Sequence, residues 1–89
     1  MTRAKRYVVS GRVQGVGFRV FVADAAGAEG LSGWVRNLPD QRVEAHAEGD
    51  AEALGRFEWR LRQGPPASRV DDVVGEDAVP RLGTGFRIA

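Results

Sequence analysis

A glycine-rich loop, Gln14-Gly15-Val16-Gly17-Phe18-Arg19, carries the residues best suited to chemistry. Glycine accepts positive φ and has no Cβ, so successive backbone N–H groups can turn toward one point and surround an anion. A helix beginning near Phe18 would add its positive N-terminal end, and the Arg19 guanidinium could clamp two phosphoryl oxygens. The loop therefore predicts a phosphoryl-binding cradle, although the same glycines would also suit a tight structural turn. Its members would be Arg19 and the amides of Gly15, Val16, Gly17 and Phe18.

A second candidate, Asn37, offers both a donor and an acceptor at the end of the strand expected after the first helix. In a sheet that brings this strand end near the glycine-rich loop, the side-chain amide could hold one water molecule. The alternative is that Asn37 simply opens the turn Asn37-Leu38-Pro39-Asp40. The residue types alone leave both interpretations open.

The elements that must position these residues follow from the spacing of apolar side chains. Period-two alternation predicts strands at residues 5–13, 31–36, 42–48, 68–74 and 85–88, and helical spacing predicts helices at 18–29 and 51–63. Asp50 is a suitable N-cap for the second helix, and Gly64-Pro65-Pro66 ends it. The order βαββαβ with a short extra C-terminal strand predicts an α+β, ferredoxin-like two-layer sandwich. Two helices would cover one face of a mainly antiparallel sheet.

The composition limits the class of protein. A chain of 89 residues, 43% of them hydrophobic and 28% charged, has room for one globular domain, expected over residues 1–89. No apolar stretch suits a signal peptide or a membrane span, so we expect a cytoplasmic protein without a membrane partner. There is no cysteine, and His46 is the sole histidine, so the chemistry is expected to need neither a metal nor another cofactor.

Charge is balanced overall but uneven along the chain. The net charge of +1 argues against broad non-specific binding to nucleic acid. Residues 1–19 contain five basic side chains and no acidic one, whereas residues 40–58 contain six acidic and two basic side chains. This pattern either favours anions at one end of the molecule or reflects two ordinary solvated faces.

Two stretches of the chain carry a specific resemblance. The segments Gly11-Arg12-Val13-Gln14-Gly15-Val16-Gly17-Phe18-Arg19 and Gly33-Trp34-Val35-Arg36-Asn37, with Gly49 later, resemble the signature stretches of the acylphosphatase family. The resemblance extends through Gly64-Pro65-Pro66 to the ending Gly85-Phe86-Arg87-Ile88. It implies a small, stand-alone, monomeric enzyme with no appended domain.

The resemblance also implies an activity and roles for two residues. Acylphosphatases hydrolyse carboxyl-phosphate anhydrides without a metal, so the implied partners are a small-molecule acyl phosphate and its product phosphate. The arginine matching Arg19 would bind phosphate beside the loop amides, and the asparagine matching Asn37 would position the attacking water. The sequence departs from the family pattern at Gln41, where a turn glycine is usual, and at Glu29, where leucine is usual. We expect Gln41 to sit at positive φ.

Other side chains with possible roles have simpler explanations. His46 should be a surface histidine, because it alternates outward on its strand beside two glutamates. Trp34 could stack on a base or an acyl group, but an aromatic side chain on the less buried sheet face explains it as well. Asp71 and Asp72 should be edge charges, since neighbouring strand residues point to opposite faces.

Two rival functions belong to other classes. An RNA-recognition module shares the βαββαβ order, and residues 17–21 faintly resemble its aromatic motif. That motif belongs on a central strand, however, whereas Phe18 and Phe21 here begin a helix. The second rival is a non-catalytic anion sensor or a carbamoyl-phosphate-handling domain, which a turnover assay would separate from an enzyme.

Overall fold

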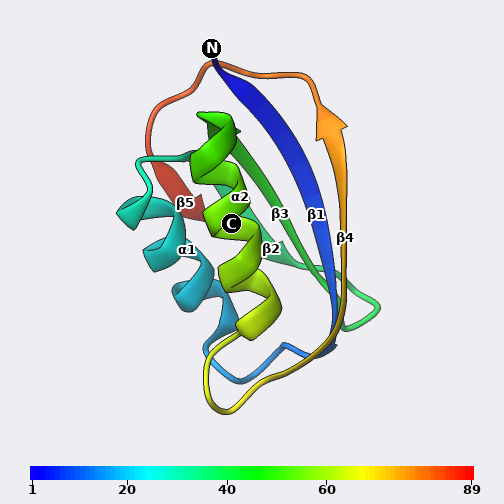
Figure 1. The fold of residues 1–89 in the computed structure, drawn as a ribbon. Coiled ribbons are helices and arrows are strands. Elements are labelled where there is room, and N and C mark those ends of the chain that lie inside the picture. Colours follow the sequence, from blue (N-terminus) through cyan, green and yellow to red (C-terminus); the bar gives the residue numbers. More distant parts are fainter.

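Two helices lie side by side on one face of a five-stranded sheet in the computed structural model, which describes residues 1–89 (Figure 1). The elements follow the chain in the order β1 (Arg3–Arg12), α1 (Phe18–Ala28), β2 (Ser32–Asn37), β3 (Val43–Gly49), α2 (Ala51–Gln63), β4 (Arg69–Ala78) and β5 (Phe86–Ile88). Neither helix is long and apolar enough to cross a membrane.

The strands are arranged in the order β4-β1-β3-β2-β5. All neighbours are antiparallel except β2 and β5, which run parallel. This confirms the predicted ferredoxin-like α+β sandwich with its short extra strand. The strand predicted at 68–74 is longer than expected, because β4 continues to Ala78 in register with Ala4 of β1. Its second half is polar and lies on the sheet edge, so no apolar alternation marked it in the sequence.

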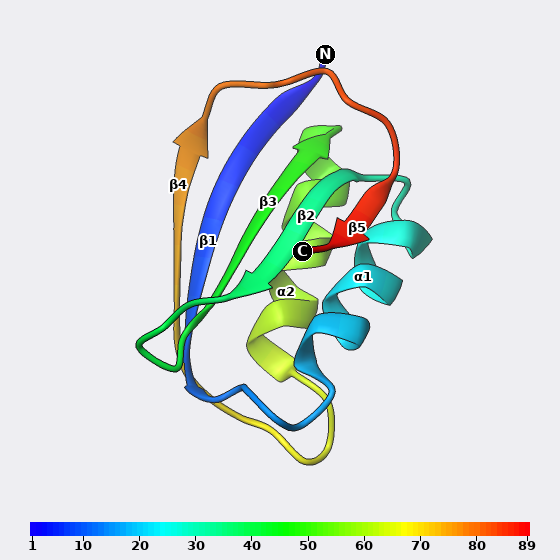
Figure 2. The same ribbon diagram turned by 180° about the vertical axis from the view of Figure 1, so that it is seen from behind.

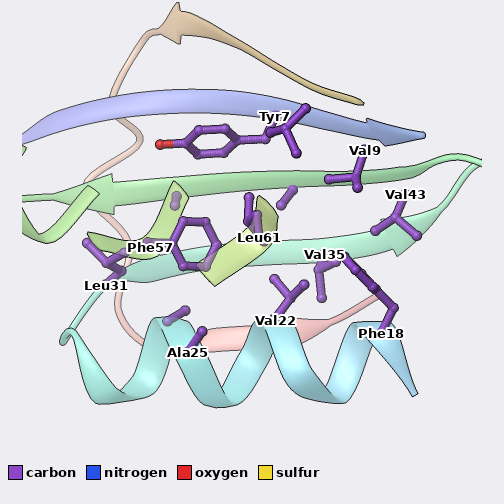
Figure 3. Packing of buried hydrophobic residues seen from close by; sticks show 14 of the residues in the cluster. Tyr7, Val9, Phe18, Val22, Ala25, Leu31, Val35, Val43, Phe57 and Leu61 are labelled. Atoms are coloured by element: carbon purple, nitrogen blue, oxygen red, sulfur yellow. The ribbon is translucent and has the colours of Figure 1, made fainter. Parts of the chain in front are cut away.

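The core lies between the helices and the sheet, as Figure 3 shows. Tyr7 and Val9 of β1 are buried, and the Tyr7 ring lies edge-on to Phe57 of α2 at 5.6 Å between ring centroids. Phe18, Val22 and Ala25 lie on the buried face of α1, and Gly30, with φ of 69°, follows the end of the helix. These packed elements fix the position of the loop that joins β1 to α1.

The second helix begins and ends as its sequence predicts. The Asp50 carboxylate accepts a hydrogen bond from the Glu52 amide at 3.2 Å, which satisfies one free N–H of the first turn. Glu29, one of the two departures from the family pattern, accepts a bond from Arg56 of α2 at 2.8 Å. The charged residue therefore links the end of α1 to α2.

Gln41, the other departure, adopts the positive φ expected of it, at 77°. Its amide donates to the Leu38 carbonyl at 3.3 Å, a bond that any residue can make. We therefore expect Gln41→Gly to raise the free energy of unfolding by about 1 kcal/mol, because glycine accepts this conformation without a Cβ penalty. Urea unfolding would measure the change. Gln41→Ala retains the Cβ and should stay near the parent, and a lower stability for the glycine variant would contradict the explanation.

The sheet face opposite the helices corrects one prediction, since His46 is buried at 5% exposure rather than exposed. Its ring stacks on Trp34 at 5.9 Å and its Nε2 lies 2.7 Å from Glu48. The connection from β4 to β5 also reaches this face, where the amides of Arg81 and Leu82 donate to the Glu48 carboxylate at 2.9 and 2.8 Å. Alternation in the sequence predicts the sheet face on which His46 lies. It does not predict that the connection from β4 to β5 reaches that face.

Glu48 should make the protein less stable in acid. Burial alone would raise its pKa, but the amides of Arg81 and Leu82 and the His46 ring together hold the pKa below the ordinary value of 4.5. A carboxyl whose pKa is lower in the folded state stabilises the fold above the unfolded pKa. That contribution is lost as the pH falls through the folded pKa. Stability should therefore decline below about pH 4.5.

The variant Glu48→Gln tests this assignment. The amide can accept one of the two backbone bonds but presents an N–H₂ group to the other donor, so we expect a loss of about 2 kcal/mol in unfolding free energy at pH 7. The decline between pH 5 and 3 should also become shallower. Glu76→Gln is the matched control, because Glu76 makes only an exposed ion pair with Arg6 at 3.2 Å. Equal effects in the two variants would contradict the role given to Glu48.

Candidate active site

The loop between β1 and α1 turns on two glycines in the left-handed region, Gly15 with φ of 72° and Gly17 with φ of 76°. A Cβ built on either one would meet nothing within 4 Å. The conformation, rather than a close contact, is therefore what favours glycine here. Gly17 is also the N-cap of α1, and no side chain caps the helix at this end.

Gly11 is a third glycine shortly before the helix, and this spacing suggests that it also belongs to the cradle, but the structure places it outside the loop. It lies within β1, where the register with β4 shifts, and a Cβ there would stand 2.1 Å from the Arg69 carbonyl oxygen. Its missing side chain allows the close approach of β4. Only two of the three glycines before the helix therefore shape the loop.

The loop leaves several backbone donors free. No backbone or side-chain acceptor pairs with the N–H groups of Gly15, Val16 or Gly17, and the first internal bond of the helix end runs from Phe21 to the Gly17 carbonyl. The opening N–H groups of an α-helix also lack partners within the helix. Free amides beside the positive end of a helix dipole form an environment suited to an anion.

Arg19 lies in the first turn of α1, half-buried beside these amides. Its single hydrogen bond is a long, exposed one, from Nη1 to the Ala89 carbonyl oxygen at 3.5 Å. No carboxylate pairs with it. The guanidinium therefore keeps its donors available to a ligand.

Asn37 ends β2, and the structure brings it to the same pocket as Arg19. The side chain is exposed and makes no hydrogen bond within the protein. The pocket has a volume of about 140 Å³. Its lining residues are Val13, Gly15, Gly17, Phe18, Arg19, Val20, Asn37 and Ile88. Val16 is the one predicted site residue that does not line it, because its side chain packs against the core.

A residue with no role assigned from the sequence, Gln14, holds the two halves of this pocket together. Its Nε2 donates to the carbonyl oxygens of Leu38 and Arg42, at 2.8 and 3.0 Å. These bonds join the loop after β1 to the turn after β2, which lie at the same end of the sheet (Figure 2). The sequence shows a glutamine at the end of a strand, but it does not indicate these hydrogen bonds, because the acceptors lie more than twenty residues away.

The basic segment at the start of the chain does not create a broad anion-attracting end. Lys5 pairs with Glu58 at 3.5 Å, and Arg6 pairs with Glu44 and Glu76. Two of the five basic side chains in this segment are therefore neutralised by carboxylates from other elements. Arg19 is the basic side chain at the pocket.

In the larger hollows on the open sheet face, the Trp34 ring already contacts other side chains of the protein. Trp34, His46 and Arg81 line two of them, with volumes of about 340 and 620 Å³. The Trp34 ring contacts His46 and lies 5.4 Å from the Arg36 guanidinium, so protein groups already occupy it. No group of three or more acidic or histidine side chains is placed to hold a metal ion.

The phenylalanines that suggest an RNA-recognition module lie on a helix and not on the sheet. Phe18 and Phe21 belong to α1, as predicted, and not to the sheet. Val43 and Ala45 of β3 are buried in the core under the helices.

Asp71 bonds to Arg69 at 2.8 Å on the exposed β4 edge, as expected of an edge charge.

Acylphosphatases match nearly the whole chain in the comparisons with known proteins. The family model described as Acylphosphatase matches residues 5–88. An acylphosphatase from Koribacter versatilis is 54% identical over 85 residues, which cover 94% of this chain and 77% of the relative. A crystal structure of acylphosphatase from Bacillus subtilis superposes with a TM-score of 0.93 at 42% identity, covering 100% of this chain and 99% of the other. An acylphosphatase structure from Coxiella burnetii gives 0.95 at 35% identity, covering 99% and 93%.

Proposed function

Because the chain belongs to the acylphosphatase family, whose members hydrolyse acyl phosphates, we propose that hydrolysis takes place in the pocket between the β1–α1 loop and the end of β2. One observation carries this proposal. Arg19 and Asn37, from different elements, line the same pocket beside amides that have no partner in the protein. The pocket thus combines an anion-binding side and a side chain free to hold water.

The phosphoryl group binds on the loop side. The amides of Gly15, Val16, Gly17 and Phe18 and the Arg19 guanidinium are the proposed donors to its non-bridging oxygens. Phosphoryl transfer passes through a loose transition state with charge spread over these oxygens, so fixed donors lower the barrier by positioning and charge stabilisation. Arg19 supplies two parallel donors, which lysine cannot copy.

The attacking water binds to Asn37. Its side-chain oxygen accepts a hydrogen bond from the water, and this orients the water for in-line attack on phosphorus. The new bond joins the water oxygen to phosphorus as the bond to the bridging oxygen breaks. The electron pair leaves with the carboxylate, and the water protons remain with the phosphate product and solvent. The leaving carboxylate needs no proton at neutral pH, because its conjugate acid has a pKa near 4.

Phosphate release from benzoyl phosphate tests the proposal. Turnover should survive excess EDTA, because the proposed donors all come from the protein. Loss of turnover on chelation, restored by added metal, would overturn the metal-free mechanism. Binding of phosphate without any turnover would instead indicate the anion sensor.

We further propose that residues 1–89 act as one monomeric, cytoplasmic domain whose partners are the small-molecule substrate and phosphate. The family match over residues 5–88 supports the single domain. Light scattering should therefore give a mass near 9.6 kDa. A mass twice as large would contradict the monomer.

A further inference from the structure

Two apolar side chains are exposed at the rim of the proposed phosphoryl pocket. Val20, from the first turn of α1, is 56% exposed, and Ile88, from β5, is 45% exposed. Other large apolar side chains are exposed elsewhere on the chain, but these are the two that line this pocket. Apolar surface that borders a polar binding site commonly serves recognition.

The lining of the pocket is divided chemically. The charged and hydrogen-bonding groups are Arg19, Asn37 and the glycine-rich backbone, which the proposed function assigns to the phosphoryl group and the water. The remaining side chains are apolar, namely Val13 and Phe18, which are buried, and Val20 and Ile88 at the rim. No carboxylate, lysine, serine or threonine lines the pocket, so no further side chain is available to pair with a polar acyl group.

Resting on the proposed function, we infer that the acyl group of the substrate packs on Val20 and Ile88. The enzyme should then prefer acyl phosphates whose acyl group is apolar or aromatic over those with a small acyl group. The acyl carbon is bonded to the bridging oxygen of the phosphate, so an acyl group must begin within the pocket and leave it past the rim. Val20 and Ile88 determine which acyl groups gain from that contact.

The double variant Val20→Thr/Ile88→Thr makes the rim polar. Threonine keeps the β-branched shape of valine and replaces a methyl group with a hydroxyl group. One methylene in an enclosed apolar pocket changes kcat/KM about 10- to 200-fold, and a rim contact should fall at the low end. We expect kcat/KM for benzoyl phosphate to fall about tenfold, with acetyl phosphate changed less than about twofold.

Val74→Thr is the matched control, because Val74 on β4 has the same 56% exposure as Val20 and does not line the pocket. Its ratio of kcat/KM values for benzoyl and acetyl phosphate should equal that of the parent. The single variant Val20→Thr, expected to lower this ratio about threefold, carries the test if the double variant does not fold.

The outcomes separate this inference from the proposed function. Turnover of both substrates with an unchanged ratio in the variants would overturn acyl recognition by the rim and leave the proposed function standing. An equal loss for both substrates would overturn it too, because it would show general damage to the site. No turnover of either substrate by the parent protein would overturn the proposed function itself.

Discussion

Replacing Arg19 with alanine is expected to lower kcat/KM for benzoyl phosphate about a thousandfold, the low end of what an arginine contributes to phosphoryl transfer. The reason is the isolation of this side chain. Arg19 stands beside free backbone amides, has no acidic partner and makes only one long bond of 3.5 Å within the protein. Its donors are therefore available to the charge that spreads over the phosphoryl oxygens in the transition state.

Stability measurements and a matched variant show whether this loss is chemical. The melting temperature of Arg19→Ala should stay within a few degrees of the parent, since little packing or hydrogen bonding is removed. Arg19→Lys should recover only part of the activity, because a point charge cannot make two parallel bonds. Arg12→Ala is the control, since Arg12 is exposed near the same loop and does not line the pocket. If Arg19→Ala retains more than a tenth of the activity, the assignment is wrong.

Most of the fold could be predicted because its elements are periodic and clearly bounded. The stripe from Phe18 to Ala25, the N-cap at Asp50 and the alternation around Tyr7 each indicate local structure without reference to distant residues. Local alternation could not predict the second half of β4, because it is a polar edge strand that forms by pairing with β1. The burial of His46 could not be predicted for a related reason, since the Trp34 ring that stacks on it comes from the neighbouring strand β2.

For the candidate site, too, the features that depend on neighbouring residues could be predicted from the sequence, and those that depend on distant contacts could not. The loop conformation could be predicted from its glycines, and the structure places Arg19 and Asn37 at one pocket as the topology suggested. The contributions of Gln14 and Ile88 could not be predicted. Each depends on a contact between elements separated by many residues, and neither residue type marks such a contact by itself.

Replacing Asn37 with alanine is expected to reduce kcat about a hundredfold while KM changes less than about threefold, because a displaced nucleophile costs roughly this much. The exposed amide makes no hydrogen bond within the protein, so its removal should leave the phosphoryl cradle and the stability intact. An interaction needed for attack but not for substrate binding lowers kcat and kcat/KM together. Steady-state kinetics with benzoyl phosphate, and inhibition by inorganic phosphate, would measure the two effects separately.

A control in the same turn strengthens the assignment of the water to Asn37. Asp40→Ala removes an exposed polar side chain that bonds only to Arg42, so both kinetic constants should remain close to the parent values. If Asn37→Ala instead raises KM and the phosphate inhibition constant while kcat is unchanged, Asn37 binds the phosphoryl group rather than the water. The attacking water would then have to be bound by the loop amides or by Arg19. In that case Arg19 would not be available to the phosphoryl oxygens alone.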